Sequence, residues 1–232
     1  MAIKKILGLV FHILIINISL SAQKYETVTV KAGMRVVDCF PFAERYRYPE
    51  FVIGRIHFKS GVYSETKLNY DFLNGEMEYL KNKDTLAIVN KKDIRFVVVA
   101  QDTFYYEKGY YLELISGGTV KVVMKEYIKL KETQKQDSYG TSSSGSSTTS
   151  YGSLPVGGNF YMLTANEDMV FQKTREYYLS DQSGRFVSYT KKNVIQLFPQ
   201  HEDKIKAYLK SNKVKFDNRD DLIRLADYLS AI

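Results

Sequence analysis

The fold is decided by residues 119–132, which read TVKVVMKEYIKLKE. Apolar side chains occupy alternate positions of this stretch, and lysines fill most of the positions between them. The apolar set is Val120, Val122, Met124, Ile128 and Leu130, and the lysines are Lys121, Lys125, Lys129 and Lys131. A period of two predicts a β-strand with one face on a hydrophobic core and the other in water.

Turn signals recur upstream of this strand at intervals of about ten residues. They are KSG at 59–61, NG at 74–75, NKD at 82–84, NKKD at 90–93, KG at 108–109 and GG at 117–118. Asn and Gly accept the positive φ of tight hairpins, so the short strands between these signals form an antiparallel meander. Units in which helices connect parallel strands would need helical stretches that the sequence lacks before residue 190. Residues 94–100, apolar on both faces apart from Arg95, predict a central strand.

The last forty residues change period. Thr190 is expected to cap a short helix that Pro199 interrupts, and residues 200–211 predict a second helix. Asn218, with Asp221 three residues later, has the character of a capping box and predicts a third helix. The inward positions of that helix are Leu222, Leu225, Ala226 and Leu229. The fold class is therefore mainly β (a β-rich α+β chain), with two or three C-terminal helices on an antiparallel meander that is an open sheet, a sandwich or a barrel.

One segment of low complexity interrupts the strands. Residues 137–153 read DSYGTSSSGSSTTSYGS and cannot bury enough apolar surface to offset the entropy of ordering them. The segment could be a domain boundary, but we expect a mobile loop between two strands of one sheet, because strand-like patterns resume after it. Residues 23–232 are then a single β-rich domain with a helical segment at 191–232.

The N-terminus has the three-part layout of a secretory signal peptide. Residues 1–22 read MAIKKILGLVFHILIINISLSA, with two lysines, an apolar run and small residues before Gln23. The alternative is a membrane anchor, but the apolar run is shorter than the roughly 20 residues that a bilayer span needs. We predict cleavage after Ala22 and export to the periplasm, the outer membrane or the cell exterior, with no transmembrane span after cleavage.

Charge content limits the expected binding partners, and cysteine content limits the expected disulfides. The formal net charge is +7, but the lysines alternate with acids along strands and turns, which is typical of a solvated sheet surface rather than a nucleic-acid groove. No nucleic-acid partner is expected, while weak attraction to an anionic envelope surface stays open. Cys39 is the only cysteine, so no intramolecular disulfide can form, and its apolar neighbours predict a buried thiol.

Motifs for metal, cofactor or nucleophilic chemistry are missing from the sequence. Outside residues 1–22 the only histidines are His57, in a strand-like segment, and His201, in the first turn of a helix. Their spacing matches no metal motif, and no ordered segment carries a nucleophile elbow. Residues 217–221 are acidic enough to consider for Ca²⁺, but helix capping accounts for them more simply. We expect no metal and no cofactor.

Carboxylates on predicted strands leave a glycosidase activity as an alternative hypothesis. Glycosidase acids come from separate strands and leave no local signature. The candidates are Glu76, Glu78, Asp102, Glu107 and Glu113. The simpler interpretation makes each of them a solvent-facing strand or turn residue.

The most distinctive candidate for binding is an aromatic hairpin. Phe104, Tyr105 and Tyr106 precede the turn at 107–109, and Tyr110 with Tyr111 follow it. Exposed rings stack on sugars or peptides at a low entropic cost. The alternative is cross-strand packing that keeps the hairpin in register.

Two segments resemble uncharacterised exported proteins of Bacteroidota. The first is a hairpin, LNYDFLNGEMEY at 68–79 followed by DTLAI at 84–88, and the second is the tail, KNVIQLFP at 192–199 with IKAYL at 205–209. The resemblance implies residence in the envelope and carries no known activity. Relatives secreted across the outer membrane end in a β-sandwich sorting domain, so a helical end favours the periplasm. The segment Asp84-Thr85-Leu86 also resembles the O-glycosylation acceptor of such proteins, which makes Thr85 a candidate acceptor.

The sequence therefore predicts an exported envelope protein that is a non-catalytic binding or assembly module. Its partner would be an envelope protein or a glycan, and the oligomeric state is left open. The alternative is a glycan-directed envelope hydrolase that uses strand-borne carboxylates.

Overall fold

The computed structural model describes residues 27–136, 142–145, 160, 163–181 and 183–232. The predicted signal peptide at 1–22 lies outside these residues. Within them, no helix combines the length and the apolar character needed to cross a membrane.

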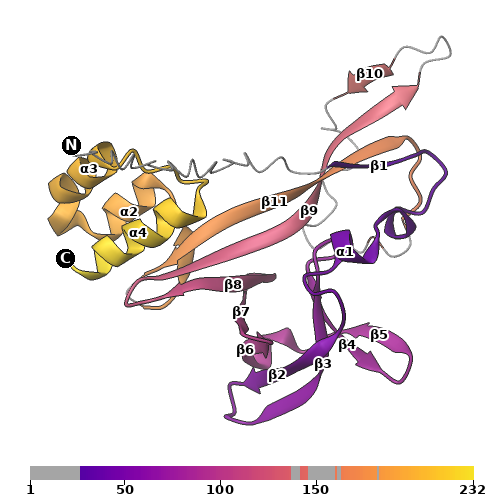
Figure 1. Cartoon of the computed structure of the whole chain (residues 1–232), viewed down its shortest axis with the longest axis horizontal. Helices are drawn as coiled ribbons and strands as arrows, with labels where there is room; N and C mark the ends of the chain where they lie inside the picture. The colour runs from indigo at the N-terminus through magenta and orange to yellow at the C-terminus, as the bar shows by residue number, and fades with distance from the viewer. Residues whose placement is uncertain (1–26, 137–141, 146–159, 161–162, 182) are drawn as a thin grey trace, which may run out of the picture.

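Twelve strands of the described residues form one open antiparallel sheet (Figure 1). They are β1 (Thr27–Val30), β2 (Val52–Phe58), β3 (Tyr63–Asp71), β4 (Glu76–Lys81), β5 (Asp84–Ala87), β6 (Ile94–Val99), β7 (Asp102–Glu107), β8 (Tyr110–Gly117), β9 (Lys121–Gln136), β10 (Ser142–Gly145), β11 (Asp168–Ser180) and β12 (Phe186–Ser188). The order is β1-β11-β9-β8-β7-β6-β2-β3-β4-β5, with β10 on β9 and β12 on β11. The predicted mainly β fold is confirmed, in its open form.

The hairpin turns lie where the sequence predicts them. The β4–β5 turn has Asn82 at φ 59°, and the β7–β8 turn has Lys108 and Gly109 at φ 52° and 91°. A turn between β6 and β7, with Ala100 at φ 52°, carries no such signal in the sequence. Val99 and Asp102 pair directly, so only two residues connect the strands, and this tight connection imposes the positive φ on Ala100. The small, exposed side chain of Ala100 tolerates this conformation.

The strand order departs from a simple meander at two points, the pairing of β1 with β11 and the pairing of β6 with β2. After β5 the chain passes through the short 3-10 helix η2 (Lys91–Asp93), and β6 then pairs with β2 rather than with β5. The short β5 exposes most of its side chains and offers no apolar face, whereas Val97 and Val99 of β6 are fully buried. Pairing with β2 brings these two valines into the same core as Ile56. The predicted central position of this strand is confirmed.

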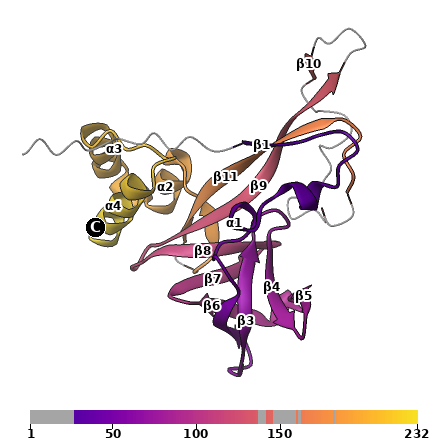
Figure 2. The ribbon, with the colours of Figure 1, turned by 45° about the vertical axis from the view of Figure 1, so that its right-hand side comes forward.

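Helices α2 (Lys191–Leu197), α3 (Glu202–Ser211) and α4 (Arg219–Ser230) follow the sheet, with the 3-10 helix η4 (Pro199–His201) between the first two. Figures 1 and 2 show them grouped at one end of the long β9–β11 pair, with β10 at the opposite end. The Thr190 side chain accepts a hydrogen bond from the Asn193 amide, and that of Asn218 accepts one from the Asp221 amide. The predicted caps are confirmed, and the predicted inward residues of α4 are buried.

The hydrophobic core has two large parts on one face of the sheet. The first lies under the segment that holds the 3-10 helix η1 (Val36–Cys39) and helix α1 (Phe42–Arg45), and includes Phe104 and Phe171. The second lies between the C-terminal helices and the sheet, and includes Val122 and Leu179. A small third part, Leu112, Val123 and Phe186, lies on the opposite face of the sheet.

The low-complexity segment is described only at residues 142–145. These residues form β10 and pair with residues 133–136 of β9 in an antiparallel register. The expected loop therefore contains a short strand, which prolongs the hydrogen bonding at the end of β9. The other residues of 137–153 lie outside the described residues.

Candidate functional site

The aromatic hairpin of β7 and β8 distributes its rings over both faces of the sheet. Tyr106 pairs with Tyr111, and Tyr105 pairs with Leu112, in a regular antiparallel register. Successive strand residues point to opposite faces. Phe104, Tyr106 and Tyr111 therefore share one face, and Tyr105 lies on the other with Tyr110.

The inward rings belong to the main hydrophobic core. Phe104 and Tyr111 are each only 1% exposed, and the ring of Tyr106 lies 5.0 Å from that of Tyr111 between centroids. The Tyr111 hydroxyl has no hydrogen-bond partner among the described residues. Cross-strand packing accounts for these three rings, so the candidates for binding are Tyr105 and Tyr110.

Tyr105 belongs to a row of five rings that crosses the sheet. From one end to the other the row consists of Tyr63 of β3, His57 of β2, Phe96 of β6, Tyr105 of β7 and Phe186 of β12. The successive centroid separations are 5.8, 4.5, 6.4 and 5.5 Å. Tyr63 is 60% exposed and Phe186 is buried, so the row emerges from the sheet surface toward β3. We call these five residues the aromatic row.

The aromatic row lies on the face of the sheet opposite the two large parts of the core. The residues buried here, Leu112, Val123 and Phe186, all come from strands. The partly buried apolar residues that pack on them are also strand residues. Among the described residues no helix packs on this side, and we call it the open face.

Cationic side chains accompany the row. The guanidinium of Arg55 lies 5.5 Å from the Tyr63 centroid, that of Arg95 lies 5.8 Å from Phe96, and the Lys121 ammonium lies 5.5 Å from Tyr105. These separations allow cation–π attraction. Exposed rings and positive charges therefore occur together along the row.

Tyr110 contributes to a separate cluster around Lys125. The Lys125 ammonium lies 3.6 Å from the Tyr110 centroid, 4.1 Å from that of Tyr127 and 3.8 Å from Glu176 Oε2. Burial lowers the pKa of Lys125. The expectation that Lys125 faces water is wrong, because the two rings and the carboxylate replace its hydration. Lys121, Lys129 and Lys131 are exposed as predicted.

Glu176 holds the same cluster together from the neighbouring strand. The hydroxyls of Tyr127 and Tyr178 donate hydrogen bonds of 2.7 and 2.8 Å to its two carboxylate oxygens. Burial acts to raise the pKa of Glu176, but these hydrogen bonds and the Lys125 charge outweigh it and lower the pKa. The Lys125 ammonium, the Glu176 carboxylate and the hydroxyls of Tyr127 and Tyr178 are thus all committed to neighbours, which indicates a structural role for this cluster.

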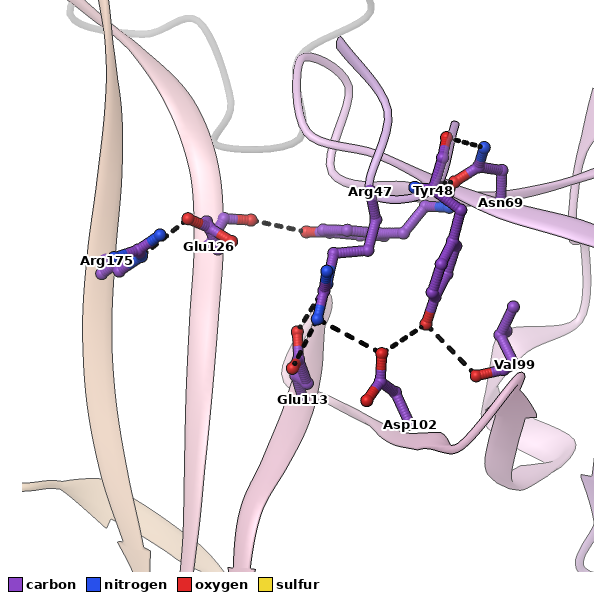
Figure 3. A network of polar contacts seen from close by, with 9 residues as sticks. Arg47, Tyr48, Asn69, Val99, Asp102, Glu113, Glu126 and Arg175 are labelled. Atoms are coloured by element: carbon purple, nitrogen blue, oxygen red, sulfur yellow. Dashed lines mark hydrogen bonds and ion pairs between the residues drawn. The ribbon is translucent and has the colours of Figure 1, made fainter. Parts of the chain in front are cut away.

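The strand-borne carboxylates lie mainly on the other face, in networks with arginines (Figure 3). Arg47 binds both oxygens of Glu113, at 3.2 Å each, and one oxygen of Asp102 at 3.2 Å. Tyr48 donates from its hydroxyl to the same Asp102 oxygen at 2.8 Å. The structure therefore brings two of the predicted carboxylates together, with a guanidinium between them.

Two of the remaining three candidates are also engaged. Glu78 is fully buried and accepts a 2.8 Å hydrogen bond from Tyr46. Glu76 forms an ion pair with Lys91. Glu107 is partly buried at the end of β7, beside the hairpin turn.

A polar cleft of about 450 Å³ lies between this network and the start of α4. Arg175 donates a 2.7 Å hydrogen bond to Glu126 on its wall, and Tyr70 donates to the Glu126 backbone carbonyl at 3.1 Å. The cleft is lined by Arg47, Glu113, Met124, Glu126, Arg175, Tyr177, Asp217, Asn218, Arg219 and Asp220. Its inner charges are of both signs and are paired with each other.

The other residues singled out by the sequence lie apart. Thr85 is exposed in the edge strand β5, two residues after Lys83, so it is accessible for the glycosylation that stays a prediction. Cys39 is only partly buried, because it lies in η1 at the margin of the core. His201 lies in η4, far along the chain from His57 of the row. Among the described residues, no three His, Cys, Asp or Glu side chains are grouped as metal ligands.

Sequence reasoning found Tyr105 but missed the rest of the row. The outward parity of β2, β3 and β6 places His57, Tyr63 and Phe96 on the same face as Tyr105 once the pairing is known. The available signal was an aromatic residue at an outward position in each strand. Without the β2–β6 pairing these positions cannot be aligned.

Comparison with known proteins gives no relative from which a function could be inferred. No protein-family model, curated protein or solved structure matches this chain.

Proposed function

We propose that this chain is a non-catalytic binding module of the cell envelope and that its ligand is a glycan lying across the open face. Residues 1–22 would export it, and residues 23–232 would act in the periplasm or at the outer membrane. The observation that carries the proposal is the aromatic row. The row lies on a sheet face that no helix of the described residues covers, and it ends in Tyr63, which is 60% exposed.

The chemistry of the row suits a sugar chain. Tyr63 is 60% exposed, and Ile53, on the same face but four residues along β2 from the partner of Tyr63, is 57% exposed. Both offer apolar surface that a ligand can cover. The C–H groups of sugar rings pack on aromatic side chains, and sugar hydroxyls accept hydrogen bonds from arginine and lysine.

A peptide ligand fits this location less well. Extended peptides bind to sheets mainly by adding a strand to an open edge. The aromatic row crosses five strands on the face of the sheet, and three of them, β2, β6 and β7, have a paired strand on each side. The outer edge of β3 is unpaired beside Tyr63, because β4 pairs with β3 only over Leu68–Asp71. Backbone groups for strand addition are therefore offered at one end of the row and not along its length.

The hydrolase alternative receives less support from the carboxylates. A glycosidase needs one carboxyl group that protonates the leaving oxygen and a second that acts as nucleophile or base. Both oxygens of Glu113 are bound to Arg47, and Glu78 is fully buried. Neither has an oxygen directed to a substrate on the open face.

The experiment is retention of the mature protein, residues 23–232, in native gels that contain soluble envelope polysaccharides. We expect retention by at least one polysaccharide and its loss in Tyr63→Ala. Phe42→Ala is the matched control, because Phe42 is an exposed ring of α1 outside the row. Unchanged retention of Tyr63→Ala, or equal loss in both variants, would refute the proposed site.

The same preparations separate the two function classes. Release of reducing sugar ends that stops in Glu113→Gln would replace the binding module by the hydrolase. Capture of a single envelope protein in stoichiometric amount, with no glycan retention, would instead identify the chain as an assembly module.

A further inference from the structure

We infer that the glycan bound by the open face carries carboxylate groups. This inference rests on the proposed function, and it specifies the ligand class from the charges that accompany the aromatic row.

Two cations beside the row are free of ion pairs. Arg95 lies over Phe96 and Lys121 lies over Tyr105, and both side chains are exposed. Neither forms a salt bridge within the part of the chain that the structure describes. A carboxylate bound to either cation would lie next to the ring on which its own sugar packs.

Two acids of the same face are already neutralised, whereas Glu107, which shares the face of Tyr105 by strand parity, lies at the end of β7 beside the hairpin turn. Glu65 accepts a 2.8 Å hydrogen bond from Arg55, which also removes Arg55 from the free cations. Glu176 is held by Lys125 and two tyrosines. The cations that remain beside the row without an ion pair among the described residues are Arg95 and Lys121.

The distribution of the two cations fits a polymer rather than a single sugar. Arg95 belongs to β6, and Lys121 belongs to β9, with β7 and β8 between these strands. The rings they accompany, Phe96 and Tyr105, are adjacent in the row, at 6.4 Å. A linear chain along the row would therefore meet cations at successive positions.

A single nucleic-acid strand also combines stacking groups with negative charge, but the row suits it less. Bases stack on aromatic rings that are open on one flat face. His57 and Phe96 stack on each other at 4.5 Å with an interplanar angle of 26°, so each covers one flat face of the other. A single-stranded oligodeoxythymidylate is therefore included in the test as the competing ligand.

The test measures the Kd of residues 23–232 for polygalacturonate and polymannuronate, and for each polymer after chemical reduction of its carboxyl groups to alcohols. We expect at least one acidic polymer to bind about tenfold more tightly than its reduced form, which corresponds to about 1.4 kcal/mol. Raising the salt concentration should weaken binding of the acidic polymer and leave binding of the reduced polymer unchanged, because salt screens exposed charges.

The variants Arg95→Gln and Lys121→Gln should each raise the Kd of the acidic polymer by about threefold, as expected for exposed ion pairs. Lys131→Gln is the control, since Lys131 is an exposed lysine farther along the same strand β9. All three changes are on exposed side chains, and circular dichroism verifies the fold of each.

The outcomes distinguish the proposed binding module from the proposed acidic ligand. Equal binding of acidic and reduced polymers, both weakened by Tyr63→Ala, would overturn the acidic ligand and leave the binding module standing. Binding of neither form would overturn both. Tighter binding of the oligodeoxythymidylate than of any polysaccharide would also overturn the inference, in favour of a nucleic acid.

Discussion

Removing the Arg45 side chain should destabilise the protein far more than removing an arginine from an exposed ion pair. Arg45 ends α1 and donates hydrogen bonds of 3.0 and 2.7 Å from Nε and Nη2 to one oxygen of Asp71. Its Nη2 also lies 3.7 Å from Glu78 Oε1. Both carboxylates have no solvent exposure. Arg45→Met keeps the aliphatic volume and leaves two buried acids without this cation.

The size of the loss follows from what each acid retains. Removing one partner of a buried ion pair costs about 3–5 kcal/mol, because the other charge stays buried. Asp71 still accepts hydrogen bonds from the amides of Leu73 and Asn74, and Glu78 still accepts one from Tyr46. We therefore expect the lower end of that range, about 3 kcal/mol. This is a large share of the roughly 5–15 kcal/mol by which a domain is stable.

The assay is urea unfolding of residues 23–232 at pH 7, followed by circular dichroism. Arg55→Met is the matched control, because its partner Glu65 is exposed and the pair should contribute less than about 1 kcal/mol. The double variant Arg45→Met/Asp71→Asn removes one of the stranded charges and should recover part of the loss. A loss in Arg45→Met no greater than in the control, or no recovery in the double variant, would refute this account of the buried acids.

Three further predictions concern packing, an orphan hydroxyl and pH. Gly54→Ala should cost about 1–3 kcal/mol in urea unfolding, because a Cβ there would lie 2.6 Å from the Val98 backbone oxygen, and an unchanged midpoint would contradict this. Tyr111→Phe removes a buried hydroxyl that lacks a partner among the described residues, so the melting temperature should stay or rise rather than fall. The pKa of Glu176 is lowered from its ordinary 4.5, so its contribution is complete above that pH and disappears as the pH falls further. The stability difference between the wild type and Glu176→Gln should therefore narrow below about pH 4.5. A difference that stays constant would refute the stabilising role of the ionised Glu176 carboxylate.

The elements that the sequence predicts correctly are those with local causes. The Asn218 cap needs only the Asp221 amide three residues on, at 3.0 Å. Lys108 and Gly109 form their turn because the two neighbouring strand ends pair directly across it. Such signals lie within one turn or one hairpin, where spacing along the chain is also spacing in the structure.

The features that the sequence does not predict depend on long-range pairing. The return of β6 to β2 and the pairing of β1 with β11 join segments that no turn connects. The alternation of residues along β9 predicts that Lys125 is a surface lysine. It is buried because Tyr110 of β8 and Glu176 of β11 contact it. The carboxylates that Arg47 joins come from β7 and β8, while the arginine comes from the segment before β2. Each of these contacts is invisible until the strand order is known.

The energetic cost of exposing each surface to a ligand is the reason for proposing the open face rather than the polar cleft as the binding site. A ligand that entered the cleft to contact Arg47 or Arg175 would have to replace their ion pairs with Glu113 and Glu126, which are largely shielded from water. Breaking such pairs leaves charges without compensation, and the cost is comparable to the binding energy of a small ligand. On the open face, Tyr63 and Ile53 are already exposed to water, and their burial contributes roughly 25 cal/mol per Å² with no pair to break. Arg95 and Lys121 add charge that no ion pair among the described residues neutralises, so the proposed ligand would meet no such cost on the open face.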